Sequence, residues 1–575
     1  MSQKGILAAI GAVLIVLGGL LAHFTQTANG IRIEDVRFKG AKGNTMSALV
    51  YIPAGATEKT PAPGILAVHG YLNSRETQDG FAIEFARRGY VVVALDQTGH
   101  GYSDPPAIAN GFGGPDGLAY LRSLPYVDKN NIGLEGHSMG GWTVLAAATA
   151  MPDAYRSIVL EGSSTGKPFA ADGTPAWPRN LALVFSKYDE FSLIMWGSEY
   201  AADIPKSAKL GAVFGVAGPI EPGRVYGDIA KGTARVLHTP ALTHPADHFS
   251  HEAIGYSLDW FGKTLTGGTP LPSTDQIWLR KEIGTLIAFV GLVVLLLGAF
   301  EILLGMAPFS TLRAVPSGPG VTTSAPSMQN GRWWTTFWVT ALLPAITYYP
   351  AFALGATWLP ASRFLPQSFT TNIAVWALIN TAITLALFPL LPKRAIRKGV
   401  VAPAILIAVA TAAICFVALW LADVLFKIDF RFWVVAFKLP SATQWMIILL
   451  YLTPFTLFFV VALHAAHRNF SRLGASAPGH YAAMILSLSL GFMILIGGQY
   501  LALWLGGKLI NPVPSSPVVP LSTIIGIQFI PLLAIVAIIS TFTWRRTGTS
   551  LPGALICGLI VTWYIVAGTA TQAAF

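Results

Sequence analysis

The sequence predicts two joined parts: a doubly wound, mostly parallel α/β sheet and an all-α polytopic transmembrane bundle. Of the 575 residues, 53% are hydrophobic and only 11% are charged, against about 25% charged in ordinary soluble domains. Residues 283–570 form a series of long apolar runs, whereas residues 30–265 alternate short β-branched runs with helical patterns. Strands that alternate with helices are typical of a parallel sheet covered by helices on both faces.

The apolar runs predict nine membrane spans, since a spanning helix needs about 20 mostly apolar residues. The first, residues 5–24, is predicted to be an uncleaved N-terminal anchor, because the run is long and the residues after it form a poor signal-peptidase site. The segment 430–437 is too short to span and is expected at the membrane interface. The other eight predicted spans are residues 283–304, 333–359, 372–391, 400–426, 445–463, 481–505, 521–543 and 552–569.

The positive charges beside these runs predict the orientation of the chain. With the N-terminus inside, the cytoplasmic loops carry more Lys and Arg than the outer loops, as the positive-inside rule requires. Residues 25–282 and the C-terminus then lie on the extracytoplasmic side of the cell membrane, although the pair Arg280-Lys281 opposes this topology. The net charge of +10 follows largely from these flanking residues, so no nucleic-acid partner is predicted. The inner cations are Arg313, Arg332, Lys393, Arg394, Arg397, Lys398, Arg468, Arg472, Arg545 and Arg546.

In the globular part, apolar runs bounded by turn residues mark the expected strands. Residues 31–38 and 47–52 are expected to form an antiparallel pair at the start of the sheet. The remaining strands are expected at residues 64–68, 90–95, 131–135, 157–161, 181–185 and 233–237, and the helices at residues 81–89, 117–124, 140–150 and 251–265.

The stretch "NIGLEGHSMGGWTVLAAA", residues 131–148, places Ser138 between a predicted strand and a predicted helix. A Gly-x-Ser-x-Gly in this context is typical of a nucleophilic serine on a sharp, strained turn. Residues two before and two after such a serine must be small, and Gly136 and Gly140 meet that requirement. Ser138 is therefore the predicted nucleophile.

A serine hydroxyl needs a general base, and the base needs an orienting carboxylate. In chain order the acid follows the serine and precedes the histidine. Asp189, just after the predicted strand 181–185, is the preferred acid, and Glu161 is the alternative. The loop before the last helix offers His244 and His248, of which His248 is preferred and His244 is the alternative base.

An oxyanion hole requires two backbone N–H groups aimed at the developing negative oxygen. One is expected from Met139, the residue after the nucleophile. The other is expected from Tyr71, because His69-Gly70 before it allows the backbone to approach closely. No metal or organic cofactor is needed for this chemistry.

These motifs together resemble the α/β-hydrolase superfamily. The matching pieces are "HGY" (69–71), "LDQTGHGYSD" (95–104), "GHSMGG" (136–141), "KYDEF" (187–191) and "ADHF" (246–249). "ADHF" is similar to the histidine motif of dienelactone-hydrolase-like members, which favours His248. The resemblance implies an eight-stranded sheet and cleavage of an ester, thioester or amide through an acyl-serine. Residues 190–226 exceed what the superfamily core needs and are expected to form a lid or access surface.

The predicted function is therefore that of a membrane-anchored serine hydrolase of the carboxylesterase or lipase kind, similar to bacterial multi-pass membrane proteins that carry an extracytoplasmic hydrolase domain. Its expected partners are the lipid bilayer and a small-molecule or lipid-linked ester; the sequence predicts no oligomeric state. One alternative is an acyltransferase that uses the same triad with a lipid-linked donor or acceptor. Another is a transporter or signalling bundle with a hydrolase-fold binding module.

Overall fold

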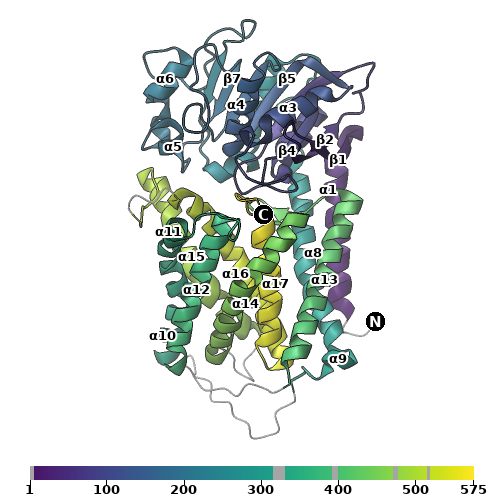
Figure 1. The fold of residues 1–575 in the computed structure, drawn as a ribbon, viewed down its shortest axis with the longest axis vertical. Coiled ribbons are helices and arrows are strands. Elements are labelled where there is room, and N and C mark those ends of the chain that lie inside the picture. The colour runs from purple at the N-terminus through teal and green to yellow at the C-terminus, as the bar shows by residue number, and fades with distance from the viewer. Residues whose placement is uncertain (1–4, 315–330, 391–398, 471–476, 514–517, 575) are drawn as a thin grey trace.

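The computed structural model describes residues 5–314, 331–390, 399–470, 477–513 and 518–574. It consists of a sheet flanked by helices and a bundle of long helices below it, which we call the sheet part and the bundle (Figure 1). The predicted cytoplasmic cations Lys393, Arg394, Arg397, Lys398 and Arg472 lie outside the described residues.

Eight strands form one sheet in the order β1-β2-β4-β3-β5-β6-β7-β8. β1 is antiparallel to β2, and β2 is antiparallel to β4, whereas all other neighbours are parallel. The predicted antiparallel pair and the mostly parallel sheet are thus confirmed. The strands are β1 (Arg32–Lys39), β2 (Thr45–Ile52), β3 (Ala62–Val68), β4 (Val91–Asp96), β5 (Val127–His137), β6 (Ser157–Glu161), β7 (Leu181–Val184) and β8 (Arg235–His238).

Helices cover both faces of this sheet. α3 (Gly114–Ser123) and α4 (Met139–Ala150) pack on one face, and α2 (Asp79–Arg87) and α7 (His251–Thr264) pack on the other. Each face therefore buries its own hydrophobic cluster, which explains why the parallel strands read as nearly continuous apolar runs. The segment between β7 and β8 adds the short helices α5 (Ser192–Trp196) and α6 (Ala208–Phe214).

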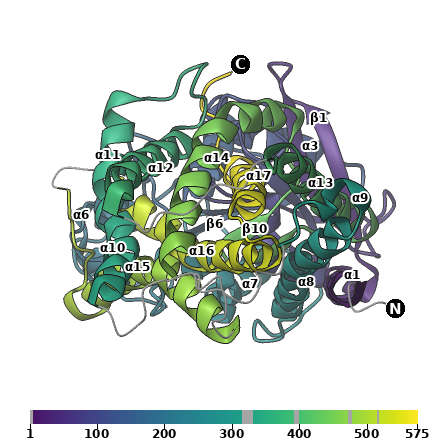
Figure 2. The same ribbon diagram turned by 90° about the horizontal axis from the view of Figure 1, so that it is seen from below.

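Within the described residues, eight helices are long and apolar enough to cross a membrane. These eight correspond to the first eight predicted spans. The ninth, α17 (Leu551–Ala567), is apolar but has only 17 residues. The predicted span 333–359 is divided into α10 (Gly331–Ile346) and α11 (Tyr348–Trp358), with Pro344 close to the division. Seen from below, α17 lies in the middle of the bundle (Figure 2). The other long helices are α1 (Ile6–Gln26), α8 (Trp278–Leu304), α12 (Ser368–Leu387), α13 (Val401–Phe426), α14 (Ala442–Phe470), α15 (Ala477–Gly506) and α16 (Val519–Thr547).

The N-terminal helix α1 packs along α8 through glycines on both helices. A Cβ added to Gly298 of α8 would lie 2.2 Å from the backbone nitrogen of Ala8, and one added to Gly11 of α1 would lie 2.4 Å from that of Leu295. Small residues let helix backbones approach closely within a membrane. α1 is therefore packed as a member of the bundle. The two chain ends lie at opposite ends of the bundle, with the C-terminus beside the sheet part (Figure 1).

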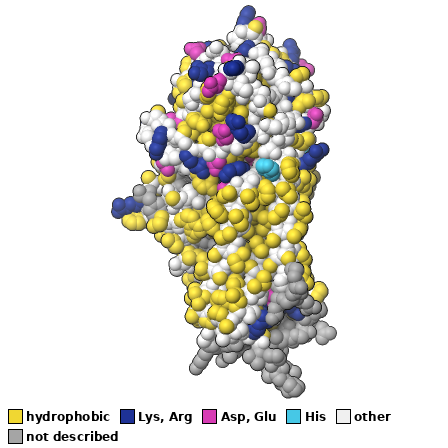
Figure 3. Space-filling view, turned by 90° about the vertical axis from the view of Figure 1, so that its right-hand side faces the viewer, with side chains coloured by type: hydrophobic (Ala, Val, Ile, Leu, Met, Phe, Trp, Pro, Cys, Tyr) yellow, Lys and Arg dark blue, Asp and Glu magenta, His cyan; other side chains and the backbone are white. Residues whose placement is uncertain are grey.

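The bundle surface fits a lipid environment. The face in Figure 3 is mostly hydrophobic over the helices, whereas charged side chains gather over the sheet part. The segment expected at the membrane interface forms a hairpin of β9 (Phe430–Phe432) and β10 (Val435–Phe437). Its turn residue Trp433 has a positive φ of 52° and contacts the sheet part, as described below.

Candidate active site

Ser138 lies at the junction between β5 and α4. Its backbone has φ 56° and ψ −121°, a conformation that non-glycine residues adopt only at a cost. The Ser138 N–H donates to the carbonyl of Glu161 at 2.8 Å, and the Ser138 carbonyl accepts from Gly141 at 2.9 Å. Its neighbours are buried, but Ser138 itself is partly exposed, so the turn presents the hydroxyl to a cavity.

The two glycines that flank the turn are required by close backbone contacts. A Cβ on Gly136 would lie 2.3 Å from the carbonyl of Gly140, and a Cβ on Gly140 would lie 2.0 Å from the carbonyl oxygen of Val68. Neither neighbour is a flexible side chain that could move aside. The predicted need for small residues on either side of Ser138 is therefore confirmed.

The loops after β7 and β8 bring Asp189 and His244 together. The strand pairing continues past the strands, since Lys187 N–H donates to Pro240 at 2.9 Å and Tyr188 N–H donates to Leu242 at 3.0 Å. This register places residue 244 beside residue 189, and His244 Nδ1 lies 2.8 Å from Asp189 Oδ2. Asp189 is 2% exposed and also accepts from Phe191 N–H at 2.7 Å. An Nδ1–H donated to the carboxylate leaves Nε2 as the proton-accepting nitrogen.

The described hydrogen bonds pair Asp189 with His244, the alternative base, and not with the preferred His248. The pairing of the two loops ends at Tyr188 and Thr243. His248 lies later in the chain, within the 3₁₀ turn His244–Phe249. Both its ring nitrogens are buried without a hydrogen-bond partner among the described residues. Burial, together with the charges of His244 and Arg431, lowers the pKa of His248 to about 3. His248 nevertheless lines the same cavity as Ser138.

The alternative acid Glu161 does not contact either histidine through its side chain in any described hydrogen bond. Its carboxylate accepts from the Ser257 hydroxyl of α7. Burial and the nearby Glu135 carboxylate raise the pKa of Glu161 well above its ordinary value. A raised pKa disfavours the charged carboxylate, which makes Glu161 a weaker candidate than Asp189 to orient the base.

Glu190 is a second carboxylate at His244 that sequence reasoning did not assign. Its Oε2 accepts from the His244 backbone N–H at 2.8 Å. Burial and the charge of Asp189 raise the pKa of Glu190 to about 7. Burial opposes the charged form of His244, but the charges of Asp189 and Glu190 outweigh it and hold the pKa of His244 above its ordinary value.

These charges predict how activity depends on pH. His244 must be neutral to accept a proton, so kcat/KM should fall as pH drops through its raised pKa. Near pH 7 Glu190 carries only part of its negative charge, and Glu190→Gln removes that part, so it should lower the pKa of His244 and move the acidic limb of the kcat/KM profile to lower pH. The profile is measured with a short water-soluble ester. Glu199→Gln, which alters an exposed carboxylate paired with Lys508, should leave the acidic limb at its wild-type pH. A shift of the acidic limb of Glu190→Gln to higher pH would contradict the assignment of His244 as the base.

The two expected oxyanion donors lie at one cavity with the serine. A cavity of about 300 Å³ is lined by Ser138, His244, Met139 and Tyr71. Met139 begins α4, and the first N–H groups of a helix have no partner within the helix. The segment expected to form a lid contributes Phe191, Ile194 and Met195 to the wall, and the bundle contributes residues of α16.

Three side chains of the bundle contact the three loops that surround Ser138. The Tyr500 hydroxyl donates to Glu190 Oε1 at 2.8 Å, next to Asp189. The Trp433 indole donates to the Pro245 carbonyl at 2.7 Å, next to His244. Gln572 donates to the Tyr71 hydroxyl. We call these the three bundle contacts. They join the bundle to the loops that carry Asp189, His244 and Tyr71.

One group among the described residues could hold a metal ion. Ligand atoms of His137, His244 and Asp247 lie within 4.8 Å of one another. His137 Nε2 already donates to the His244 carbonyl at 3.0 Å, and Asp247 accepts from the Ser186 hydroxyl. A metal on His244 would compete with proton transfer at the same imidazole, so we treat this group as a hydrogen-bonded support for the His244 loop.

Comparison with known proteins agrees with this geometry. Residues 63–194 match a family described as the alpha/beta hydrolase fold. The sheet part has the α/β-hydrolase fold. The eight-stranded, mostly parallel sheet and the position of Ser138 between β5 and α4 are those expected from the sequence.

Two curated relatives match parts of this chain. A 2-(acetamidomethylene)succinate hydrolase of Mesorhizobium japonicum is 32% identical over 111 residues, which is 19% of this chain and 38% of the relative. A 2-hydroxy-6-oxononadienedioate/2-hydroxy-6-oxononatrienedioate hydrolase of Cupriavidus pinatubonensis is 35% identical over 80 residues, 14% of this chain and 28% of the relative. The matched regions thus span less than half of either relative.

Solved structures are also similar to part of this chain. An esterase of Pyrococcus furiosus is 17% identical and covers 42% of this chain and 96% of its own, with a TM-score of 0.31. Brefeldin A esterase, a bacterial homologue of human hormone-sensitive lipase, is 13% identical and covers 46% of this chain and 86% of its own, with a TM-score of 0.31.

Proposed function

We propose that this protein is a membrane-anchored serine hydrolase that cleaves an ester, thioester or amide through an acyl-serine intermediate. The observation that carries the proposal is the strained turn that presents Ser138 to a cavity shared with His244, whose Nδ1 is paired with Asp189. The α/β-hydrolase fold and the two relatives named as hydrolases support the same class of reaction.

In the proposed reaction, His244 Nε2 takes the proton of Ser138 as Oγ attacks the carbonyl carbon. The oxyanion that forms is held by the N–H groups of Met139 and Tyr71. Asp189 keeps the imidazole in the correct tautomer and stabilises its positive charge. When the intermediate collapses, His244 returns the proton to the leaving group, and Ser138 keeps the acyl group. A water molecule, deprotonated by His244, then releases the acid and restores the serine.

The proposed setting is the extracytoplasmic face of the cell membrane. The excess of Lys and Arg in the predicted inner loops supports this side. The contacts of the bundle with the acid, base and Tyr71 loops support a site that works only while anchored. The close packing of α1 against α8 supports retention of the first helix as an anchor.

A fluorophosphonate probe tests the proposal directly, since it forms a stable bond only with an activated serine. We expect the purified full-length protein to be labelled once, on the peptide that contains Ser138, and its ester turnover to fall in parallel with labelling. Prior treatment with a slow ester substrate should protect the serine. Label found on another serine, or turnover that persists after complete labelling of Ser138, would refute the mechanism.

A further inference from the structure

The Ser138 cavity continues into the bundle. Six residues line both this cavity and a second cavity of about 90 Å³ between the helices, so the two spaces adjoin. We call these six residues the neck. Two come from the loop after Tyr71 and four from the bundle: Leu72, Asn73, Phe369, Val434, Ile525 and Gln528.

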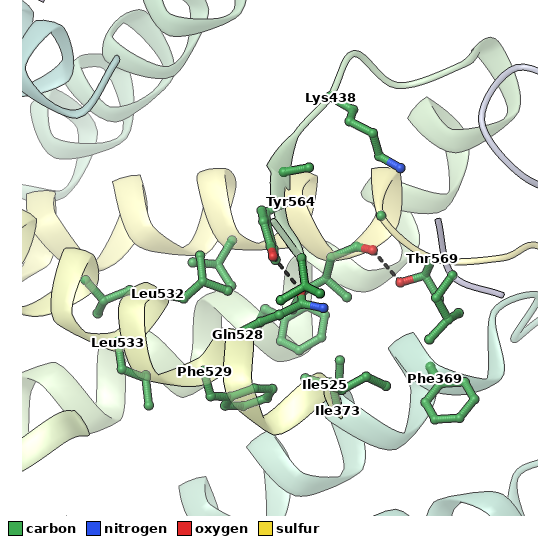
Figure 4. A pocket seen from close by; sticks show the side chains of 18 of the residues that line it. Phe369, Ile373, Lys438, Ile525, Gln528, Phe529, Leu532, Leu533, Tyr564 and Thr569 are labelled. Carbon is green, nitrogen blue, oxygen red and sulfur yellow. Dashed lines mark hydrogen bonds between the residues drawn. The ribbon is translucent and has the colours of Figure 1, made fainter. Parts of the chain in front are cut away.

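The inner cavity is apolar over most of its length. Lys438 lies at one end and Leu532 and Leu533 at the other (Figure 4), and the walls come from α12, α14, α16 and α17. At the neck, the Tyr564 hydroxyl donates to Gln528 Oε1 at 2.5 Å. Leu533 also lines a third cavity of about 100 Å³ deeper in the bundle. A row of apolar spaces therefore leads from the serine into the membrane-spanning helices.

We propose that the neck and the inner cavity bind the acyl chain of the substrate, so that the protein prefers esters of long-chain fatty acids. This inference rests on the proposed serine mechanism and adds the substrate class. An apolar cavity with few polar groups suits a hydrocarbon chain. A helix bundle within the membrane has no need of an internal apolar space for its own stability, because unfilled space forfeits dispersion contacts.

The position of the neck indicates that the inner cavity binds the acyl half of the ester and not the leaving group. His244 must protonate the leaving group, so that group lies on the side of the His244 loop. None of the six neck residues belongs to that loop, whereas Leu72 and Asn73 directly follow Tyr71, the expected oxyanion donor. The hydrocarbon chain of the substrate that enters the bundle is therefore the one attached to the carbonyl carbon.

A pair of tryptophan variants on α12 tests this assignment. Ile373 is 6% exposed and lines the inner cavity, whereas Leu378 on the same helix is 42% exposed on the outer face. With p-nitrophenyl esters in detergent, Ile373→Trp should lower kcat/KM for laurate by about ten-fold or more and leave butyrate within about two-fold of wild type, because the indole fills space that only the long chain reaches. Leu378→Trp should match wild type on both esters. Leu533→Trp, deeper in the bundle, should affect palmitate more than laurate.

The outcomes separate this inference from the proposed function. Butyrate turnover reports that each variant is folded and that the serine mechanism works. If Ile373→Trp and wild type show the same ratio of laurate to butyrate turnover, the acyl-chain site is refuted while the hydrolase stands. If Ile373→Trp impairs dodecyl acetate but not lauroyl esters, the acyl assignment is overturned. If wild type cleaves neither butyrate nor laurate, the proposed function itself fails.

Discussion

Replacing His244 with alanine should lower kcat/KM for a short ester by about 10⁶-fold, the scale on which loss of a triad base acts in serine hydrolases. In the proposed mechanism the imidazole that pairs with Asp189 moves the proton, and His248 has no such carboxylate partner among the described residues. His248→Ala should retain activity within about ten-fold of wild type, because neither ring nitrogen of His248 bonds to a described residue. The measurement is p-nitrophenyl butyrate hydrolysis by purified protein in detergent.

The two alanine variants are matched, since both remove a buried imidazole from the same 3₁₀ turn. Thermal melting shows whether either loss reflects misfolding. A reversed ranking, with His248→Ala inactive and His244→Ala active, would return the base to the residue that the "ADHF" motif favoured.

Ser138→Gly should lower turnover by about 10⁶-fold and yet raise the melting temperature. Glycine adopts a positive φ without the Cβ clash that serine suffers at φ 56°, so relief of strain is worth about 1 kcal/mol, or about 2–4 °C for a domain of this size. Ser138→Ala is the control, because it removes the hydroxyl but keeps the Cβ and its strain. If the melting temperature of Ser138→Gly is equal to or lower than that of Ser138→Ala, the backbone conformation at position 138 does not destabilise the fold.

The sheet and the strained turn at Ser138 were predictable because their signals are local. Gly136, Ser138 and Gly140 stand at fixed spacing between a β-branched run and a small-residue run, and the backbone contacts that require these glycines follow from that spacing. The position of Asp189 was also predictable, since it follows a strand at the carboxyl edge of the sheet. The choice between His244 and His248 was not predictable, because it depends on the register of two loops. Hydrogen bonds from Lys187 and Tyr188 determine that register.

The bundle's share in the site was not predictable from the sequence. Tyr500, Trp433 and Gln572 contact the sheet part across 310, 188 and 501 positions of the chain, and no local pattern marks such pairs. Each residue reads as an ordinary aromatic or amide near the end of a span. The only local hint was the second carboxylate in "KYDEF", where Glu190 stands beside the acid without a role of its own.

The three bundle contacts have a consequence for biosynthesis. Ribosomes make the chain from its N-terminus, and domains tend to fold in that order, so the sheet can form long before Gln572 exists. The loop that carries Tyr71 gains its bundle partner only after α17 has been translated and inserted. If Tyr71 is the oxyanion donor as proposed, we expect the newly made chain to reach full activity only after α17 is in place.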